Sequence, residues 1–449
     1  MIRRNAEKQI NDWIDNGKYA LLITGARQIG KTYLIRNCLK EKNIPYIELN
    51  FIENPEYIEL FSKSFSSKDI IMRLSLIGGE KLISGKTVIF LDEVQECKEL
   101  ITAIKFLVED GSFKYILSGS LLGIELNDLK SAPVGYMSIY DMYPLTFKEF
   151  IKALGVSNEI LDILKQCYKN HTEVDVFIHN KLIDLFNLYL IVGGMPEAVS
   201  TYIETNNLEK VSKVHEKIIR LYKQDFSKYE VNNKLKLKEI YDAMPSQLDQ
   251  KNKRFRLNVL GDKMNYDRAE NSFLWLKDAG VAIPVYNLNE PKLPFILNEN
   301  RSLFKLFFSD VGLLTSQYSL QTKMAILNKE QSINNGSLFE NVVAQELLSK
   351  GFKLYYFNSK KQGELDFLIE LNGKVLPIEV KSGKDYKKHS ALNNVMNDLN
   401  YDIPKAYILN QNNIEIKDKL VYLPIYMLMF IKNDEIKNPV YKLDLKGLM

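Results

Sequence analysis

The chain contains little cysteine and little histidine, which narrows the chemistry open to it. Its 449 residues include three cysteines, Cys38, Cys97 and Cys167, which lie far apart and form no CxxC pair. The four histidines show no metal-ligand spacing. This pattern is typical of a reducing compartment and argues against both a disulfide framework and a zinc site. We therefore expect any metal ion to be held by carboxylates, hydroxyls and phosphates.

Long apolar runs and a strong excess of one charge are also lacking. The apolar segment Tyr422–Ile431 is interrupted by Pro424 and is much shorter than the roughly 20 residues of a transmembrane helix. We expect a buried strand there. The first residues lack the apolar core of a secretory signal, so we expect a cytoplasmic protein without membrane contact. A net charge of +4 does not by itself predict a nucleic-acid-binding protein.

The length predicts two to four domains of roughly 100–200 residues each. In residues 1–150, helix-length segments separate four short, nearly all-apolar runs. Such runs are typical of parallel strands that helices cover on both faces, so an α/β fold with a parallel sheet is predicted. The expected strands are Tyr19–Thr24, Tyr46–Asn50, Val88–Leu91 and Tyr115–Ser118.

Three further units are predicted after this sheet. Residues 151–228 show helical periodicity and predict a helical lid. Residues 229–320 predict a winged-helix-like unit whose hairpin runs through VAIPVYNLNEPKLPFI, with the turn at NLNEP. A polar linker, Lys323–Asn335, precedes an α/β unit over 336–449. In that unit we expect a helix (Ser337–Lys350), three strands (Lys353–Asn358, Glu364–Leu371 and Val375–Lys381), a second helix and a fourth strand (Ala406–Leu409).

A phosphate-binding loop follows the first strand. The residues GARQIGKT satisfy G-x-x-x-x-G-K-[ST] between a predicted strand and a predicted helix. Its two glycines allow backbone N–H groups to turn towards phosphates, and the helix dipole adds to the attraction. Lys31 would reach the β- and γ-phosphates of ATP, and the hydroxyl of Thr32 would bind Mg²⁺. The predicted nucleotide-binding residues are Gly25, Ala26, Arg27, Gln28, Ile29, Gly30, Lys31, Thr32 and Tyr33.

Two acids end the third strand, at the sheet edge where open α/β sheets bind ligands. We expect Asp92 beside the Mg²⁺ and Glu93 as the residue that orients or deprotonates the attacking water. The alternative is an acidic helix cap formed by Asp92 through Gln95. The fourth strand ends in Ser118 and Ser120, either of which could hydrogen-bond the γ-phosphate or the water, or only cap a turn.

The motifs GARQIGKT, VIFLDEVQE, ILSGS, MYPLTFKEF and GGMPEAV together resemble a prokaryotic AAA-superfamily ATPase with an added C-terminal domain of unknown function. This resemblance extends over essentially the whole chain and implies ATP hydrolysis. It places Gly194, Met195 and Pro196 at the nucleotide, although Pro196 could equally be the first residue of a helix. No arginine finger is identifiable, and Arg220 is the best candidate.

A second constellation lies near the C-terminus. Side chains two residues apart on a strand share a face, so Glu379 and Lys381 point together, and Asp366 joins them if its strand is the neighbour. Two carboxylates and a lysine could hold Mg²⁺ and cleave a phosphodiester. The arrangement resembles the PD-(D/E)xK restriction-endonuclease-like fold. That resemblance implies Glu340, Asp366 and Glu379 as metal ligands and Lys381 as the catalytic lysine, although Leu365 replaces the usual proline.

The sequence is compatible with more than one class of binding partner. Lysines interleaved with tyrosines around the second constellation suit nucleic acid such as DNA, but such loops also occur without a partner. The basic residues in question are Lys360, Lys361, Lys384, Lys387 and Lys388, and the tyrosines are Tyr355, Tyr356 and Tyr386. We therefore weigh an ATPase coupled to a nuclease-like domain against a nucleotide-gated signalling switch with an inert nuclease fold. A homo-oligomer is compatible with either hypothesis.

Overall fold

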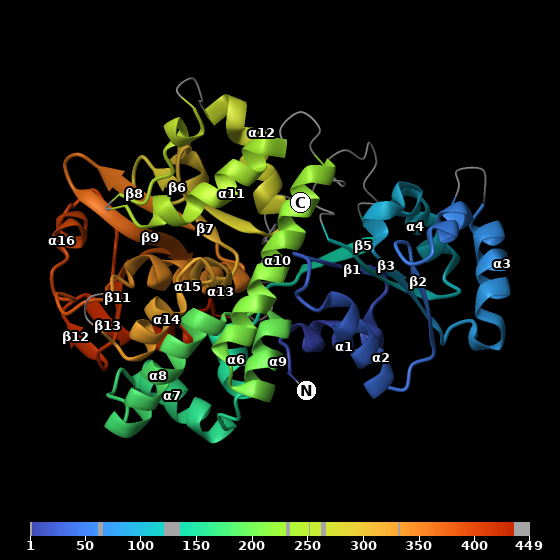
Figure 1. Cartoon of the computed structure of the whole chain (residues 1–449), viewed down its shortest axis with the longest axis horizontal. Coiled ribbons are helices and arrows are strands. Elements are labelled where there is room, and N and C mark those ends of the chain that lie inside the picture. The colour runs from blue at the N-terminus through green and yellow to red at the C-terminus, as the bar shows by residue number, and fades with distance from the viewer. Residues whose placement is uncertain are drawn as a thin grey trace, which may run out of the picture.

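The computed structural model describes residues 2–61, 66–120, 135–229, 234–250, 252–261, 266–330 and 333–434. It contains two β-sheets, which lie on opposite sides of the view in Figure 1 with the long helix α10 between them. The blue N-terminal sheet and its helices form one side, and the orange and red C-terminal sheet forms the other. No helix within the described residues is both long and apolar enough to cross a bilayer.

The first sheet has five strands in the order β2-β3-β4-β1-β5, and all neighbours are parallel. The predicted parallel α/β sheet is therefore confirmed. The fifth strand was not predicted because it lies at the sheet edge and three of its five residues are exposed, so it lacks the apolar run of a central strand. The strands are β1 (Ala20–Thr24), β2 (Tyr46–Asn50), β3 (Val88–Asp92), β4 (Lys114–Ser118) and β5 (Met137–Asp141).

Helices cover both faces of this sheet. On β1, Leu21 and Ile23 belong to one hydrophobic core and Leu22 to the other, because successive side chains of a strand point to opposite faces. Burial on both faces explains why the central strands are almost uniformly apolar. The covering helices are α1 (Ala6–Asn16), α2 (Lys31–Glu41), α3 (Ser67–Gly78) and α4 (Lys98–Asp110).

The segment that follows is helical, as the periodicity predicts. Its apolar side chains continue the core that starts beneath the first sheet and extends to the second. The helices are α6 (Phe147–Ala153), α7 (Asn158–Asn170), α8 (Val176–Val192), α9 (Pro196–Thr205) and α10 (Leu208–Tyr229).

The second sheet has eight strands in the order β12-β13-β11-β10-β9-β8-β6-β7. Its hairpin β6–β7 corrects the sequence prediction, because the second strand is Glu299–Phe308 and not the KLPFI segment. Pro291 and Pro294 lack a backbone N–H and so disfavour pairing there. Instead of forming a separate wing, β6 (Ala282–Leu288) pairs in parallel with β8, so the winged-helix interpretation is not confirmed.

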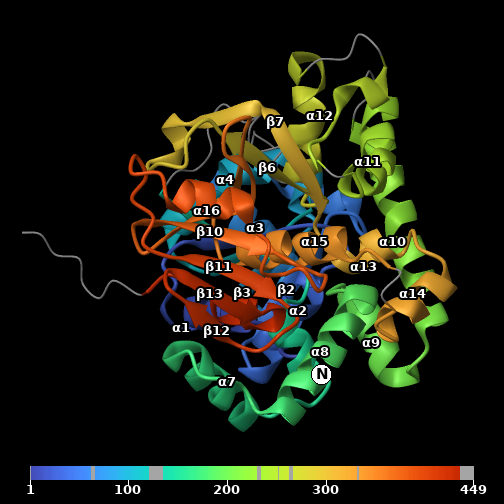
Figure 2. The ribbon, with the colours of Figure 1, turned by 90° about the vertical axis from the view of Figure 1, so that its left-hand side faces the viewer.

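The remaining elements build the rest of this C-terminal unit, which Figure 2 shows from the side of its red and orange strands. The predicted linker is wrong in its first part, because Lys323 is buried within a helix. Of the run Tyr422–Ile431, only the part up to Pro424 is a strand, and Ile425–Phe430 is a 3-10 helix.

These elements are α11 (Lys234–Leu248), α12 (Tyr266–Asp278), β7 (Glu299–Phe308), α13 (Val311–Thr315), α14 (Leu320–Leu327), α15 (Gly336–Ser349), β8 (Tyr355–Ser359), β9 (Gly363–Leu371), β10 (Lys374–Val380), α16 (Ser390–Met396), β11 (Ala406–Asn410), β12 (Glu415–Lys417) and β13 (Leu420–Pro424).

Candidate active site

The predicted phosphate-binding loop connects β1 to α2, in the strand–loop–helix context that its sequence requires. Gly25 and Gly30 have φ values of 132° and 87°, in the region that favours glycine. A Cβ on Gly25 would lie 2.2 Å from the carbonyl oxygen of Met142. The loop therefore needs glycine both for its backbone conformation and for close packing against the segment after β5.

Lys31 begins α2 and is buried against this loop. Its Nζ donates hydrogen bonds to the carbonyl oxygens of Gly25 at 2.9 Å and Ala26 at 2.8 Å. Burial lowers the pKa of Lys31 to about 8, although the nearby acids Glu93 and Asp92 oppose that shift. The side chain can therefore present a positive charge at the mouth of the loop at neutral pH.

Asp92 ends β3 and is surrounded by hydrogen-bond donors. The Thr32 hydroxyl lies 3.1 Å from each of its carboxylate oxygens, and the Asn50 amide donates to Oδ2 at 3.0 Å. The Ser118 hydroxyl, from the end of β4, also donates to Asp92. Burial raises the pKa of Asp92, and the hydrogen bond from Ser118 opposes this shift. Hydroxyl and carboxylate oxygens this close together suit Mg²⁺, which prefers oxygen ligands.

Glu93 lies immediately beyond this strand, in a left-handed backbone conformation with φ of 56°. The amide of Gln95 donates to its Oε2 at 2.7 Å. Gln95 thus contacts Glu93, and Asp92 does not cap the following 3-10 turn, in contrast to the alternative that the sequence left open. The half-buried Glu93 carboxylate lies beside Asp92 and Lys31, and its negative charge helps to raise the pKa of Asp92 and opposes the lowering of the pKa of Lys31.

The two serine candidates have different partners. Ser118 contacts Asp92, whereas Ser120 accepts a hydrogen bond from Arg27 Nε at 3.3 Å. Arg27 also forms an ion pair with Asp225 of α10 at 2.7 Å. The loop is therefore tied to α10.

Another residue of α10 also reaches the loop, since the Tyr222 hydroxyl donates to the Arg27 carbonyl oxygen at 3.1 Å. Arg220 is two residues away on the same helix and is exposed, so it points away from the loop of its own chain. As an arginine finger it could serve only a neighbouring molecule.

The GGMPEAV segment lies against the loop. Pro196 is at the start of α9, and a Cβ built on Gly30 would lie 3.7 Å from Pro196 Cγ. The backbone N–H of Gly194 donates to Asp310 Oδ2 at 2.6 Å. Burial raises the pKa of Asp310 to about 6, and hydrogen bonds from backbone N–H groups, that of Gly194 foremost, oppose the shift.

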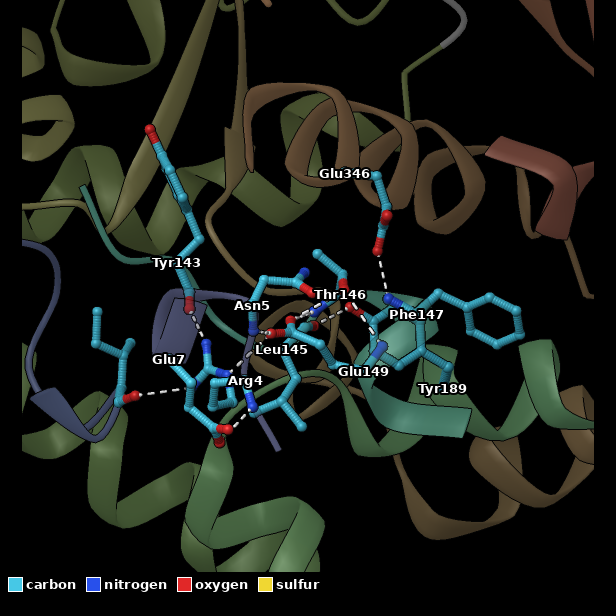
Figure 3. A network of polar contacts seen from close by, with 11 residues as sticks. Arg4, Asn5, Glu7, Tyr143, Leu145, Thr146, Phe147, Glu149, Tyr189 and Glu346 are labelled. Atoms are coloured by element: carbon cyan, nitrogen blue, oxygen red, sulfur yellow. Dashed lines mark hydrogen bonds and ion pairs between the residues drawn. The ribbon is translucent and has the colours of Figure 1, made fainter. Parts of the chain in front are cut away.

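A network centred on Arg4 and Glu149 joins the loop to the C-terminal unit (Figure 3). Arg4 donates to the carbonyl oxygens of Ile29, at 3.1 Å, and Tyr143, at 2.6 Å, and forms a buried ion pair with Glu149 at 3.3 Å. Glu149 also completes a capping box with Thr146 at the start of α6.

The network continues into the second sheet's unit through α15. Glu346 of this helix accepts a hydrogen bond from the backbone N–H of Phe147, the residue after Thr146 (Figure 3). Sequence reasoning did not identify Arg4, Glu149 or Glu346 as site residues. The Thr146-x-x-Glu149 spacing in MYPLTFKEF is a capping-box signature that could have pointed to the first part of this network.

The second predicted constellation also comes together in space. Strands β9 and β10 are antiparallel neighbours, and Asp366 Oδ2 accepts a hydrogen bond from the Val380 N–H at 2.9 Å. Glu379 lies 2.9 Å from Lys381 Nζ. Burial and the negative charge of Asp366 raise the pKa of Glu379 to about 8. Glu340 of α15 is close enough to contribute to the same shift.

These carboxylates do not form a metal site within the described part of the chain, where no group of three acidic, histidine or cysteine side chains has metal-binding spacing. Lys305 of β7 lies among them, with its Nζ 2.7 Å from Glu364 and 3.6 Å from Glu340. Lys253 contacts Glu340 at 2.6 Å. The geometry thus does not fit the divalent ion that the nuclease resemblance implies.

The surrounding basic patch is smaller than the sequence suggests. Tyr355 and Tyr356 are buried in the core of the sheet, so they cannot stack on bases at the surface. Lys387 pairs with Glu415 at 2.9 Å. Of the basic residues predicted to contact nucleic acid, those exposed without a described ion pair are Lys360, Lys361 and Lys384.

Comparisons with known proteins relate three parts of the chain to described families. Residues 17–151 match a family described as an AAA domain. Residues 183–324 and 335–428 match two families described only as domains of unknown function (DUF8612 and DUF4143). A search of curated proteins finds no match.

Two similar solved structures have low sequence identity to this chain. A Walker-type ATPase of Pyrococcus abyssi is 16% identical, with 70% of this chain and 95% of that chain covered and a TM-score of 0.46. Cdc6p of Pyrobaculum aerophilum is 11% identical, with 74% and 96% covered and a TM-score of 0.29. The family match and the parallel five-stranded sheet both support an AAA-type P-loop fold for residues 17–151.

Proposed function

We propose that this protein binds ATP together with Mg²⁺ and hydrolyses it at the loop between β1 and α2, because residues 17–151 form an AAA-type P-loop ATPase domain. The observation that carries the proposal is the joint position of Lys31, Thr32 and Asp92. The Thr32 hydroxyl lies 3.1 Å from the Asp92 carboxylate, directly beside a buried lysine at the start of a helix. This combination of a cation, oxygen ligands and a helix N-terminus suits a nucleoside triphosphate.

Each side chain has a role that follows from its position. Lys31 and the loop N–H groups would bind the phosphates, and Thr32 and Asp92 would hold Mg²⁺, which neutralises charge that develops during phosphoryl transfer. Glu93 would orient the attacking water and accept its proton. Ser118 acts through Asp92, which its hydroxyl contacts, and is therefore a positioning residue.

The ATPase proposal is tested with purified full-length protein. Lys31→Ala should abolish ATP binding, and Glu93→Gln should retain ATP binding but lose hydrolysis by at least about a hundredfold, as for the loss of a general base. Lys40→Ala, at an exposed position near the end of the same helix, is the matched control. ATP turnover that survives Lys31→Ala would show that this loop is not the catalytic site.

A second candidate function concerns the C-terminal unit, which we propose binds nucleic acid or acts on DNA. The supporting observation is that Asp366, near the start of β9, lies close to Glu379 and Lys381 at the end of the neighbouring strand β10. DNA affinity should fall steeply with salt and weaken when Lys360, Lys361 and Lys384 are replaced. If the protein shows no salt-dependent DNA binding in any nucleotide state, the alternative of a nucleotide-gated switch for a protein partner is favoured.

The contacts between the two units support coupling between ATP and the C-terminal unit. Arg27 reaches Asp225 of α10, and the Arg4–Glu149 pair leads through Phe147 to Glu346 of α15. A change in the loop on nucleotide binding would therefore act on groups that contact the second unit directly. Dependence of specific ATPase activity on protein concentration would indicate that a homo-oligomer supplies a further catalytic residue.

A further inference from the structure

Two lysines from segments that precede residue 336 enter the carboxylate cluster of the C-terminal unit. Lys305, from hairpin strand β7, has only 1% of its side chain exposed. Its Nζ lies 2.7 Å from Glu364 Oε1 and 3.6 Å from Glu340 Oε2. It also lies 5.1 Å from the centre of the Tyr356 ring, whose face favours a cation. A fully enclosed ammonium group therefore lies between a carboxylate of β9 and one of α15.

The other carboxylates of the cluster are also engaged. Lys253 Nζ contacts Glu340 Oε1 at 2.6 Å, and Lys381 Nζ contacts Glu379 Oε2 at 2.9 Å. Asp366 accepts a hydrogen bond from the Val380 backbone N–H at 2.9 Å. Four acids, with a formal charge of −4, thus face three lysines, with a formal charge of +3. The four acids are Glu340, Glu364, Asp366 and Glu379.

The charges of this cluster depend on each other. Although burial lowers the pKa of Lys305, the attraction of Glu340 and Glu364 is stronger and the net pKa is raised, so the ammonium stays protonated. A buried ammonium group is stable only when carboxylates compensate its charge, and the buried carboxylate of Glu340 in turn needs a cation beside it. Lys305 thus already supplies the positive charge that these carboxylates need.

We propose that Lys305, assisted by Lys253, occupies the place of the divalent cation that the nuclease resemblance implies, so that this carboxylate cluster holds no metal ion. This inference does not depend on ATP hydrolysis. It bears on the second proposed function, since a site without a divalent ion is suited to binding and lacks the charge needed for metal-assisted phosphodiester cleavage.

The test is Mn²⁺ binding to the nucleotide-free full-length protein, followed by electron paramagnetic resonance of the free ion. The wild type and Asp366→Asn should bind the same amount of Mn²⁺, because the cluster of the wild type holds no ion. Asp92→Asn reports separately on any ion at the ATP site. Lys253→Met combined with Lys305→Met removes both ammonium groups at similar side-chain length. Glu340 contacts both of these lysines, so in the double variant its side chain is free to turn towards Asp366 and Glu379. The double variant should therefore gain one Mn²⁺ site, and adding Asp366→Asn should abolish it.

Two results would overturn the proposal. One is binding of Mn²⁺ by the wild type that Asp366→Asn removes and Asp92→Asn does not. The other is a folded double variant without any new Mn²⁺ site, because the carboxylates would then not be arranged for a cation. Where the double variant does not fold, the wild-type comparison with Asp366→Asn still decides the question. Loss of ATPase activity in any variant would bear only on the first proposed function.

Discussion

Replacing Arg4 by methionine should weaken both folding and ATP binding. Its guanidinium joins the phosphate-binding loop, at the Ile29 carbonyl oxygen, to Tyr143 and to Glu149 (Figure 3). Only 8% of the Arg4 side chain and 7% of the Glu149 side chain are exposed. Removing one partner of a buried ion pair costs about 3–5 kcal/mol. Glu149 keeps donors such as the Asn5 N–H at 2.6 Å, so we expect the lower end, about 3 kcal/mol.

The assay compares Arg4→Met with Arg3→Met in the same thermal unfolding and ATP-binding experiments. About 3 kcal/mol corresponds to a fall in the unfolding midpoint of roughly 6–12 °C for a unit of 150–250 residues. Because the Ile29 carbonyl loses its anchor, the affinity for ATP should also fall, by about tenfold for a loss of 1.4 kcal/mol. Arg3 is the matched control, because its pairs with Glu7 and Glu41 lie at the surface and are weak.

A specific result would refute this reasoning. If Arg4→Met unfolds at the same temperature as Arg3→Met and binds ATP equally well, the network in Figure 3 does not support the loop. If the midpoint falls but ATP affinity is unchanged, Arg4 contributes only to stability. Arg4→Lys, which keeps the charge but cannot bridge three acceptors, should give an intermediate effect on both measurements.

Two further predictions concern the ends of β4 and β7. Ser118→Ala should lower the rate of ATP hydrolysis about tenfold or more, because a hydrogen bond to the Asp92 carboxylate is worth about 1.5–3 kcal/mol, and Ser120→Ala should have a smaller effect in the same turnover assay. Since the pKa of Asp310 is raised in the folded state to about 6, folding is favoured at low pH and loses up to about 3 kcal/mol as pH rises from 4 to 7. The free energy of unfolding, measured with denaturant, should fall by that amount in the wild type relative to Asp310→Asn, whose remaining side-chain oxygen can still accept a hydrogen bond from Gly194. If the difference in the free energy of unfolding between the two proteins does not change with pH, the prediction is wrong.

Features encoded in short stretches of sequence were predictable. The loop GARQIGKT, the uniformly apolar strand before Asp92 and the helix that begins at Lys31 all occur where local pattern places them. Parallel central strands are buried on both faces, so their composition alone indicates the sheet. The edge strand β5 lacks this double burial, and its sequence carries no comparable signal.

Relations between distant segments could not be read from such patterns. Tyr355 and Tyr356 look like surface aromatics among lysines, yet they are buried because both faces of β8 are packed: Tyr355 belongs to one hydrophobic core and Tyr356 to another. The wing expected in 229–320 is instead part of the second sheet, because β6 finds its partner in β8. Strand pairing depends on complementary hydrogen bonding and burial across the chain, and these are properties of the whole fold.

The two candidate sites differ for the same physical reason. Amino-acid order alone was enough to place the candidate nucleotide site, because one continuous loop supplies the N–H groups, the lysine and the hydroxyl that a phosphate requires. It also indicated that Asp366, Glu379 and Lys381 would meet, since side-chain alternation on strands is local. Only the tertiary structure showed Lys253 and Lys305 beside Glu340, the first of them 87 residues away along the chain. Charge compensation in a buried site depends on which side chains approach in space, and only the folded chain decides that.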